Sequence, residues 1–148
     1  MPEDTQRIID LMLQLWNSGS AEAAKQLYSE SAERYDPNDP QACRGSQEIA
    51  RYVAEVRNGF PDFKLQIDET IAQGDRFVIH WTCTGTHRGE YQGIPPTGRT
   101  VRISGASLER IENGSITEDR VYFDRLTLLE QLGVSSDALT TQTKAAAG

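Results

Sequence analysis

The sequence predicts an α+β domain in which a curved antiparallel sheet wraps around N-terminal helices. Two observations carry this prediction. Apolar residues recur at helical spacing in the first part of the chain, and from Phe63 to Phe123 they recur at every second position. Helices followed by a run of strands are typical of an α+β layer architecture. A sheet curved around its own helices encloses a cone, and cones of this kind hold pockets for small apolar ligands.

Two helices are predicted at the start of the chain. The first stops at Asn17-Ser18-Gly19, and Ser20 is in position to cap the second. Their inward-facing residues are Ile8, Leu11, Met12, Leu15 and Trp16 in the first, and Ala24, Leu27 and Tyr28 in the second.

A short strand or turn follows from Glu33 to Tyr35, and it runs into the loop 37–40. Two prolines make that loop rigid. The next helix begins near Ser46 and ends at Gly59, a position where helices commonly stop in the left-handed conformation.

The strands are recognised by alternation and by their turns. The alternating apolar residues are Phe63, Leu65, Ile67 and Ile71 in one segment, and Phe77, Ile79, Trp81 and Cys83 in the next. Segments 101–111 and 116–123 form a hairpin around Asn113-Gly114, the strongest short hairpin signal. A final helix carries Leu128, Leu129 and Leu132 and ends at Gly133.

The turn type of this hairpin decides which face Arg110 occupies. With a two-residue type I′ turn, Ile111 pairs with Ile116, and Arg110 faces away from Glu118. With a three-residue turn and a glycine bulge, Arg110 pairs with Ile116 and joins the face that carries Glu118 and Asp124. The sequence leaves both alternatives open.

Composition excludes several classes of function. The chain has 148 residues and a net charge of −7, which argues against a nucleic-acid partner. No apolar run is long enough to span a bilayer and no secretory signal opens the chain, so we expect a cytoplasmic protein without a membrane partner. Cys43 and Cys83 are expected to be reduced thiols, and no residues have metal-ligand spacing. We expect one domain over residues 1–139 and a flexible tail over 140–148.

Three segments in order resemble the SnoaL-like polyketide cyclases (ester cyclases) of the NTF2-like superfamily. Residues 85–99 read GTHRGEYQGIPPTGR and are similar to the family signature GTH-x-G-x-x-x-G-I-P-P-T-G-K/R. Residues 110–118 resemble the hairpin R-I-x-x-G-K-I-x-E, and residues 124–133 resemble the ending D-x-x-x-L-L-x-Q-L-G. Phe60-Pro61-Asp62-Phe63 and Gly45 also fit the family.

The resemblance implies an NTF2-like cone without metal or organic cofactor, and a homodimer or higher homo-oligomer. It implies a small apolar or aromatic ligand and ring closure of a polyketide by intramolecular aldol condensation. A pocket aspartate acts as general acid and base in this chemistry, and by motif position it is Asp124. An apolar pocket would raise its pKa for that purpose. The alternative is that Asp124 caps the final helix.

Relatives often carry histidine at the positions of Arg110 and Tyr35. Arginine is no base at neutral pH, but Arg110 could stabilise an enolate or alkoxide; the alternative is an exposed strand arginine. Tyr35 could donate a hydrogen bond to a substrate oxygen. The aromatic residues expected to contact substrate are Trp16, Tyr35, Tyr52, Trp81 and Tyr122.

The two histidines are expected to have structural roles. His80 alternates with Trp81, so it belongs to the outer face of the sheet or to a dimer interface, together with Thr82 and Thr84. His87 is expected to brace its loop, whose segment 95–98 forms a stiff rim.

Two other functions remain open at this point. The pocket could hold a ligand without turning it over, as in a binding or accessory protein. It could also hydrolyse epoxides through an Asp-Arg-Asp relay, for which Asp124 and Arg110 supply two members and no second aspartate is evident.

Overall fold

The structure is a computed structural model that describes residues 3–134. The predicted tail, 140–148, and the last residues of the predicted domain, 135–139, lie outside the described residues. Along the described chain the elements are α1 (Glu3–Ser18), α2 (Ala21–Leu27), β1 (Tyr28–Asp36), β2 (Asp39–Arg44), α3 (Gly45–Gly59), β3 (Lys64–Gln73), β4 (Arg76–Thr86), β5 (Thr100–Glu112), β6 (Ser115–Phe123) and α4 (Arg125–Leu132).

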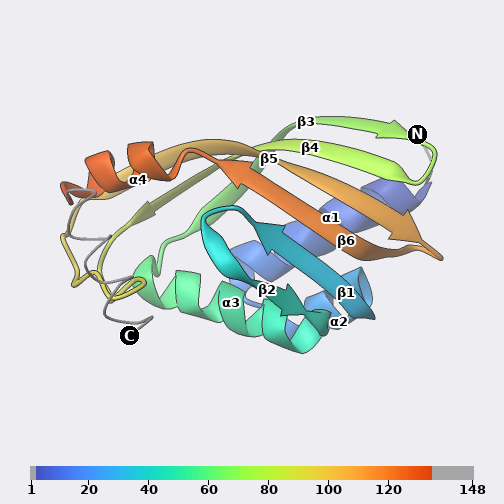
Figure 1. Ribbon diagram of the computed structural model, residues 1–148, viewed down its shortest axis with the longest axis horizontal. Coiled ribbons are helices and arrows are strands. Elements are labelled where there is room, and N and C mark those ends of the chain that lie inside the picture. The colour runs from blue at the N-terminus through green and yellow to red at the C-terminus, as the bar shows by residue number, and fades with distance from the viewer. Residues whose placement is uncertain (1–2, 135–148) are drawn as a thin grey trace.

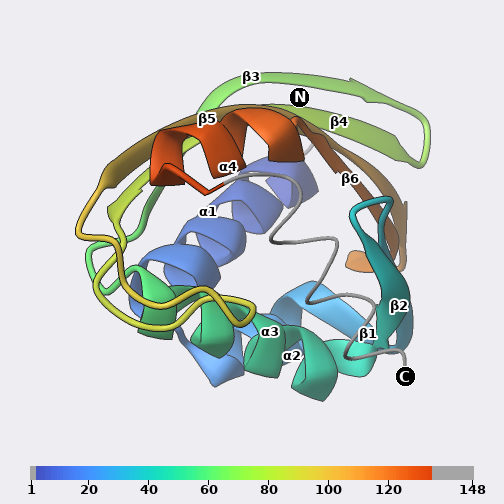
Figure 2. The same ribbon diagram turned by 60° about the vertical axis from the view of Figure 1, so that its left-hand side comes forward.

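One sheet organises these elements, with strands in the order β2-β1-β6-β5-β4-β3. The sheet arches over α1, and α2 and α3 lie on the opposite side of the enclosed space (Figures 1 and 2). This is the predicted α+β cone of the NTF2-like fold, with one difference. β1 pairs with β6 in parallel, whereas every other neighbouring pair is antiparallel. Because most of the chain separates β1 from β6, no tight turn fixes their relative direction.

Two predicted boundaries near the first strand were wrong. α2 ends at Leu27, and Tyr28 already begins β1, which is nine residues long rather than a short strand or turn. Ser20 does cap α2, since its hydroxyl accepts a hydrogen bond from the backbone N–H of Ala23.

α3 ends at Gly59 as predicted, but for another reason. Gly59 is not left-handed. Its carbonyl accepts hydrogen bonds from the N–H groups of Arg88 and Gly89, and a Cβ here would lie 2.9 Å from Cβ of Tyr91. The close approach of the loop after β4 therefore requires glycine.

A bulge in β3 changes the face of Ile71. The register shifts between Ile67 and Glu69, so that the residues beyond the shift lose the alternation read from the sequence. Ile71 is therefore exposed rather than part of the inner face.

The hairpin between β5 and β6 combines both predicted alternatives. Asn113 and Gly114 have positive φ, and Ile111 pairs with Ile116, as in the two-residue turn. The register then shifts at Thr117, so Arg110 pairs with Glu118 and shares its face. The type I′ turn is confirmed, yet the bulge gives Arg110 the face expected for the longer turn.

The loop between β4 and β5 is fastened by His87, as predicted. Its side chain is fully buried, its Nδ1 accepts a hydrogen bond from the backbone N–H of Thr97 at 3.1 Å, and its ring stacks on Phe60. His80 is exposed on the outer face, and Thr82 hydrogen-bonds Asp68 there, whereas Thr84 borders the inner pocket. None of the helices within residues 3–134 has the length and apolar character needed to cross a membrane.

Candidate functional site

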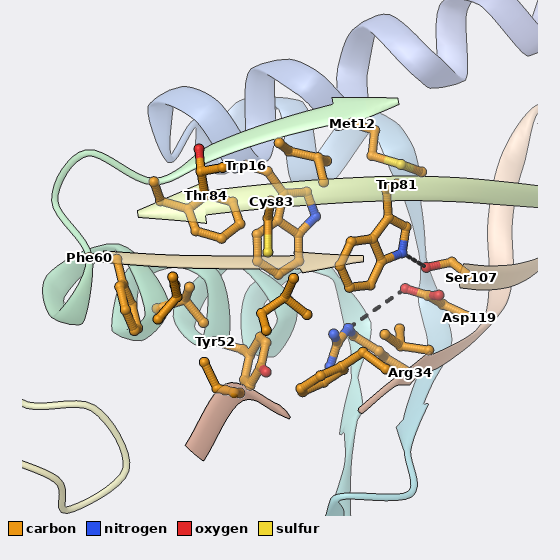
Figure 3. Close-up of a pocket in the computed structure, with 18 of the residues that line it drawn as sticks. Met12, Trp16, Arg34, Tyr52, Phe60, Trp81, Cys83, Thr84, Ser107 and Asp119 are labelled. Carbon is orange, nitrogen blue, oxygen red and sulfur yellow. Dashed lines mark hydrogen bonds and ion pairs between the residues drawn. The ribbon is translucent and has the colours of Figure 1, made fainter. Parts of the chain in front are cut away.

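A cavity of about 110 Å³ lies between the concave face of the sheet and the helices (Figure 3). Its walls are mainly apolar and aromatic. These residues are Met12, Trp16, Tyr52, Val56, Phe60, Phe63, Leu65, Trp81, Cys83, Tyr91, Val101, Ile103, Val121, Phe123 and Leu128. Cys83 and Cys43 are both free thiols, as expected.

Three charged residues cross the floor of this cavity in one row. Arg34 on β1 pairs with Asp119 on β6, and Asp119 pairs with Glu109 on β5. Strand pairing therefore places their side chains next to one another on the concave face. Their exposed fractions are only 5%, 3% and 1%. Charged side chains buried to this extent require specific partners.

Asp119 is the centre of this row. Its Oδ2 accepts a hydrogen bond from the Tyr28 hydroxyl at 3.2 Å and lies 3.7 Å from Nε of Arg34. On its other side, Asp119 is paired with Glu109 across β6 and β5, so the two carboxyl groups are neighbours. Oε2 of Glu109 and Oδ1 of Asp119 are buried and have no hydrogen-bond donor within residues 3–134. Two buried neighbouring carboxyl groups repel each other when both are ionised, which favours a single proton on the pair.

The surroundings of the two carboxyl groups decide which one carries the proton. Burial raises the pKa of Glu109 well above its ordinary value, and the nearby charge of Asp119 raises it further. Burial also raises the pKa of Asp119, but the Arg34 guanidinium, the neighbouring Glu109 carboxyl group and the hydrogen bond from Tyr28 oppose this rise. These surroundings therefore favour the proton on Glu109 and ionisation of Asp119.

Trp81 extends over Gly105, its partner on β5, because residue 105 has no side chain. Its Nε1 donates a hydrogen bond to Oγ of Ser107 at 3.0 Å. A Cβ at Gly105 would lie 2.4 Å from Cζ2 of Trp81, closer than carbon atoms can approach. Glycine at this position is thus what allows the indole to form one wall of the cavity.

The structure separates the five aromatic residues that were expected to contact substrate. Trp16, Tyr52 and Trp81 line the cavity, where a bound substrate would meet them. Tyr122 is exposed on the convex face, and the ring of Tyr35 on the same face is covered by the Arg120 guanidinium at 4.7 Å. Tyr35 and Tyr122 are one residue out of phase with the inward-facing positions of β1 and β6.

The two expected catalytic residues are not brought together and do not line the cavity. Asp124 is the exposed N-cap of α4, where it accepts hydrogen bonds from the backbone N–H of Thr127 at 3.2 Å and from its hydroxyl at 2.9 Å. These hydrogen bonds lower its pKa, opposite to what a general acid requires. Arg110 lies on the convex face, 3.8 Å from Glu118 and 3.9 Å from Asp75. This geometry matches the alternatives in which Asp124 caps the final helix and Arg110 is an exposed strand arginine.

Sequence reasoning missed Arg34, Glu109 and Asp119, although two of them carried a signal. Glu109 is in phase with Val101 and Ile103 on β5, and Asp119 is in phase with Val121 on β6. A carboxyl group at an apolar position of a strand is a candidate functional group, because it must be buried.

The comparisons with known proteins agree with this architecture. The model of the SnoaL-like polyketide cyclase family matches residues 6–132. The chain belongs to this family. Among curated proteins, none matches the sequence significantly.

Several solved structures are similar in fold to this SnoaL-like chain. TsrD from Streptomyces laurentii is 23% identical, with a TM-score of 0.82 over 91% of this chain and 99% of that one. IdmH from Streptomyces antibioticus, a proposed polyketide cyclase, is 26% identical, with a TM-score of 0.76 over 90% and 100%. A protein from Catenulispora acidiphila with a ketosteroid isomerase-like fold is 20% identical, with a TM-score of 0.77 over 93% and 97%. The family match supports a cyclase-type function, and these structures show the same fold.

Proposed function

We propose that this SnoaL-like chain closes a ring in a small polyketide-type substrate by intramolecular aldol condensation, without a cofactor. Asp119 acts as the base and Glu109 as the acid, in place of Asp124. The observation that carries this proposal is the pair of buried carboxyl groups, Asp119 and Glu109, side by side in an apolar cavity. Such a pair supplies both proton transfers that an aldol closure needs.

The proposed steps balance in protons and bonds. Asp119 takes a proton from the carbon next to a substrate carbonyl, and the resulting enolate attacks a second carbonyl carbon of the same molecule. A carbon–carbon bond forms, and the second carbonyl oxygen becomes an alkoxide that takes the proton of Glu109. The proton on Asp119 then passes to the neighbouring Glu109 carboxylate, which restores the starting state.

The charge of Arg34 supports this division of roles. Arg34 lies nearer to Asp119 than to Glu109 in the strand order, so it favours ionisation of Asp119. The walls of the cavity are mainly apolar and aromatic, and electrostatic interactions are stronger in such surroundings than in water.

Proton exchange in deuterated water tests the first step without knowledge of the natural substrate. A small aryl 1,3-dicarbonyl ester is incubated with the protein. Mass spectrometry measures deuterium incorporation at the carbon between the two carbonyl groups and detects any cyclised product. We expect exchange above the buffer rate, lost in Asp119→Asn and kept in Glu118→Gln, the matched variant on the convex face. A ligand that binds but neither exchanges nor cyclises faster than in buffer would favour a binding protein instead.

Epoxide hydrolysis is a second candidate, because the same row supplies the acidic pair that the sequence had not revealed. Asp119 would take a proton from water, and the resulting hydroxide would attack an epoxide carbon. The carbon–oxygen bond at that carbon would break, and the epoxide oxygen would take the proton of Glu109. An aryl epoxide converted to its diol, with one oxygen from labelled water, would support this function. An epoxide recovered unchanged by an exchange-active protein would exclude it.

A further inference from the structure

Arg34 is a buried guanidinium with an unmet need for hydrogen-bond acceptors. Its Nε is buried without a hydrogen-bond partner within residues 3–134, and Oδ2 of Asp119 at 3.7 Å is beyond hydrogen-bond distance. The guanidinium lies over the ring of Tyr52 at 4.4 Å and extends into the cavity between Tyr52 and Asp119 (Figure 3). A buried charged donor left unpaired is costly, so an acceptor supplied by the bound molecule would stabilise it.

The charges on the cavity floor indicate what kind of acceptor fits. Arg34 carries one positive charge, and Asp119 is the carboxylate nearest to it. Asp36, buried two residues further along β1, also acts on both Arg34 and Asp119, so the surroundings of the guanidinium have no surplus of positive charge. A ligand carboxylate would bring a second negative charge next to Asp119 in an apolar cavity, where repulsion is weakly screened. A neutral carbonyl oxygen accepts hydrogen bonds without adding charge.

The groups around the guanidinium describe the rest of the ligand. Tyr52 lies against one side of Arg34, Trp16 is 5.9 Å away, and the remaining wall is apolar. A flat apolar body would pack against these rings while its carbonyl points to the floor.

We propose that Arg34 is the specificity-determining residue of this pocket and selects neutral carbonyl compounds with a flat apolar body over the corresponding carboxylates. This inference rests on the proposed function in placing the substrate in the same cavity. It concerns binding, however, and is tested without turnover.

Intrinsic fluorescence gives the binding readout, because both tryptophans of the chain, Trp16 and Trp81, line the cavity. The probes share a phenyl ring: acetophenone carries a carbonyl, benzoate a carboxylate, and ethylbenzene neither. We expect the wild-type protein to bind acetophenone roughly tenfold or more tightly than either of the others, the effect of a hydrogen bond to a charged donor. Calorimetry with the same probes checks each dissociation constant.

Two double variants separate the hydrogen bond from the charge. Arg34→Met/Asp119→Asn removes donor and counter-charge together, so acetophenone should lose its advantage over ethylbenzene. Asp119→Asn/Glu109→Gln leaves Arg34 without a counter-charge, so benzoate should gain roughly tenfold or more. Arg110→Met, an arginine of the convex face, should leave all three affinities unchanged.

Equal or tighter binding of benzoate by the wild-type protein would overturn the proposal. So would an acetophenone preference that survives removal of Arg34. If the Arg34 variant does not fold, the wild-type comparison and the Asp119→Asn/Glu109→Gln variant still decide the question. A protein with the predicted preferences but without exchange or cyclisation would refute the proposed function alone.

Discussion

The two faces of strands β1, β5 and β6 carry similar residues in different surroundings. On the concave face, Arg34, Asp119 and Glu109 lie in a row and are buried. On the convex face, Arg110 and Arg120 both contact Glu118, and these side chains are 35%, 43% and 25% exposed. Each concave residue of β5 and β6 is next in sequence to a convex one.

The difference lies in burial and not in residue type. Water solvates the convex ion pairs, so their charges are ordinary surface charges. On the concave face, burial raises the pKa of Glu109 well above its ordinary value, and the neighbouring Asp119 raises it further. The same alternation that makes one face a solvated surface therefore makes the other a candidate acid–base site.

The largest expected effect is on turnover. Asp119→Asn should lower the rate of exchange or cyclisation by about 10²–10⁴-fold, because it removes a positioned base. Glu118→Gln, one residue away on the convex face, should leave the rate within about twofold, as expected for a surface charge. Steady-state rates of the two variants, with circular dichroism to check folding, make the comparison. Similar losses in both would contradict the distinction between the faces.

The second effect is a pH-dependent change in stability. An unfolded chain releases the Glu109 proton near the ordinary value of 4.5, whereas the folded chain keeps it to higher pH. Between these two values the folded state binds more protons, so the wild-type stability falls as pH rises. Glu109→Gln removes this titration, and its amide can donate to Asp119.

Above about pH 4.5, the free energy of unfolding of Glu109→Gln should therefore rise relative to that of the wild type, by up to about 1.4 kcal/mol per pH unit. Urea unfolding at a series of pH values measures the two curves. Glu118→Gln is the matched control, and parallel curves for Glu109→Gln and wild type would show that Glu109 is not protonated in the folded protein.

A smaller effect is expected at the cap of α4. Asp124→Ala should lower the melting temperature by a few degrees, because the N–H of Thr127 loses its acceptor. Asp124→Asn should retain the cap, and both variants should keep their activity. A strong loss of activity in Asp124→Asn would restore the catalytic assignment drawn from the family motif.

The smallest effect concerns the convex ion pairs. Arg110→Gln should change the free energy of unfolding by less than about 1 kcal/mol, because both of its carboxylate partners are partly solvated. Thermal melts at low and high salt measure the change. A larger, salt-insensitive loss would mean that this face is covered in solution.

Such a cover is expected if the protein is a homodimer joined through the convex face, where His80 and Tyr122 are exposed. Light scattering would then give about twice the chain mass of 16.5 kDa. A monomer mass at every working concentration would contradict this prediction.

Much of the fold followed from local signals. Helical spacing predicted α1 and α3, and Asn113-Gly114 predicted the turn between β5 and β6. The parallel pairing of β1 with β6 did not follow, because it joins segments far apart in the chain and has no turn to announce it.

The candidate site depended on that hidden pairing. Arg34 reaches Asp119 only through the contact of β1 with β6, so no local pattern could place them together. The bulge at Thr117 pairs Arg110 with Glu118 and so decides which β6 residues share its face. The family motif drew attention to Asp124, but its hydrogen bonds make it the N-cap of α4. In contrast, Trp81 and Trp16 were predicted correctly, because large apolar side chains in a regular phase face inward.

The glycine beneath Trp81 controls how much room a substrate has. An alanine at Gly105 would overlap the indole and the backbone carbonyl of Tyr122, so the ring would have to tilt away from the sheet and into the cavity. The hydrogen bond from the indole to Ser107 would then be lost. Gly105 is not one of the residues that line the cavity, yet it sets the position of Trp81 and so the space between that wall and the opposite one.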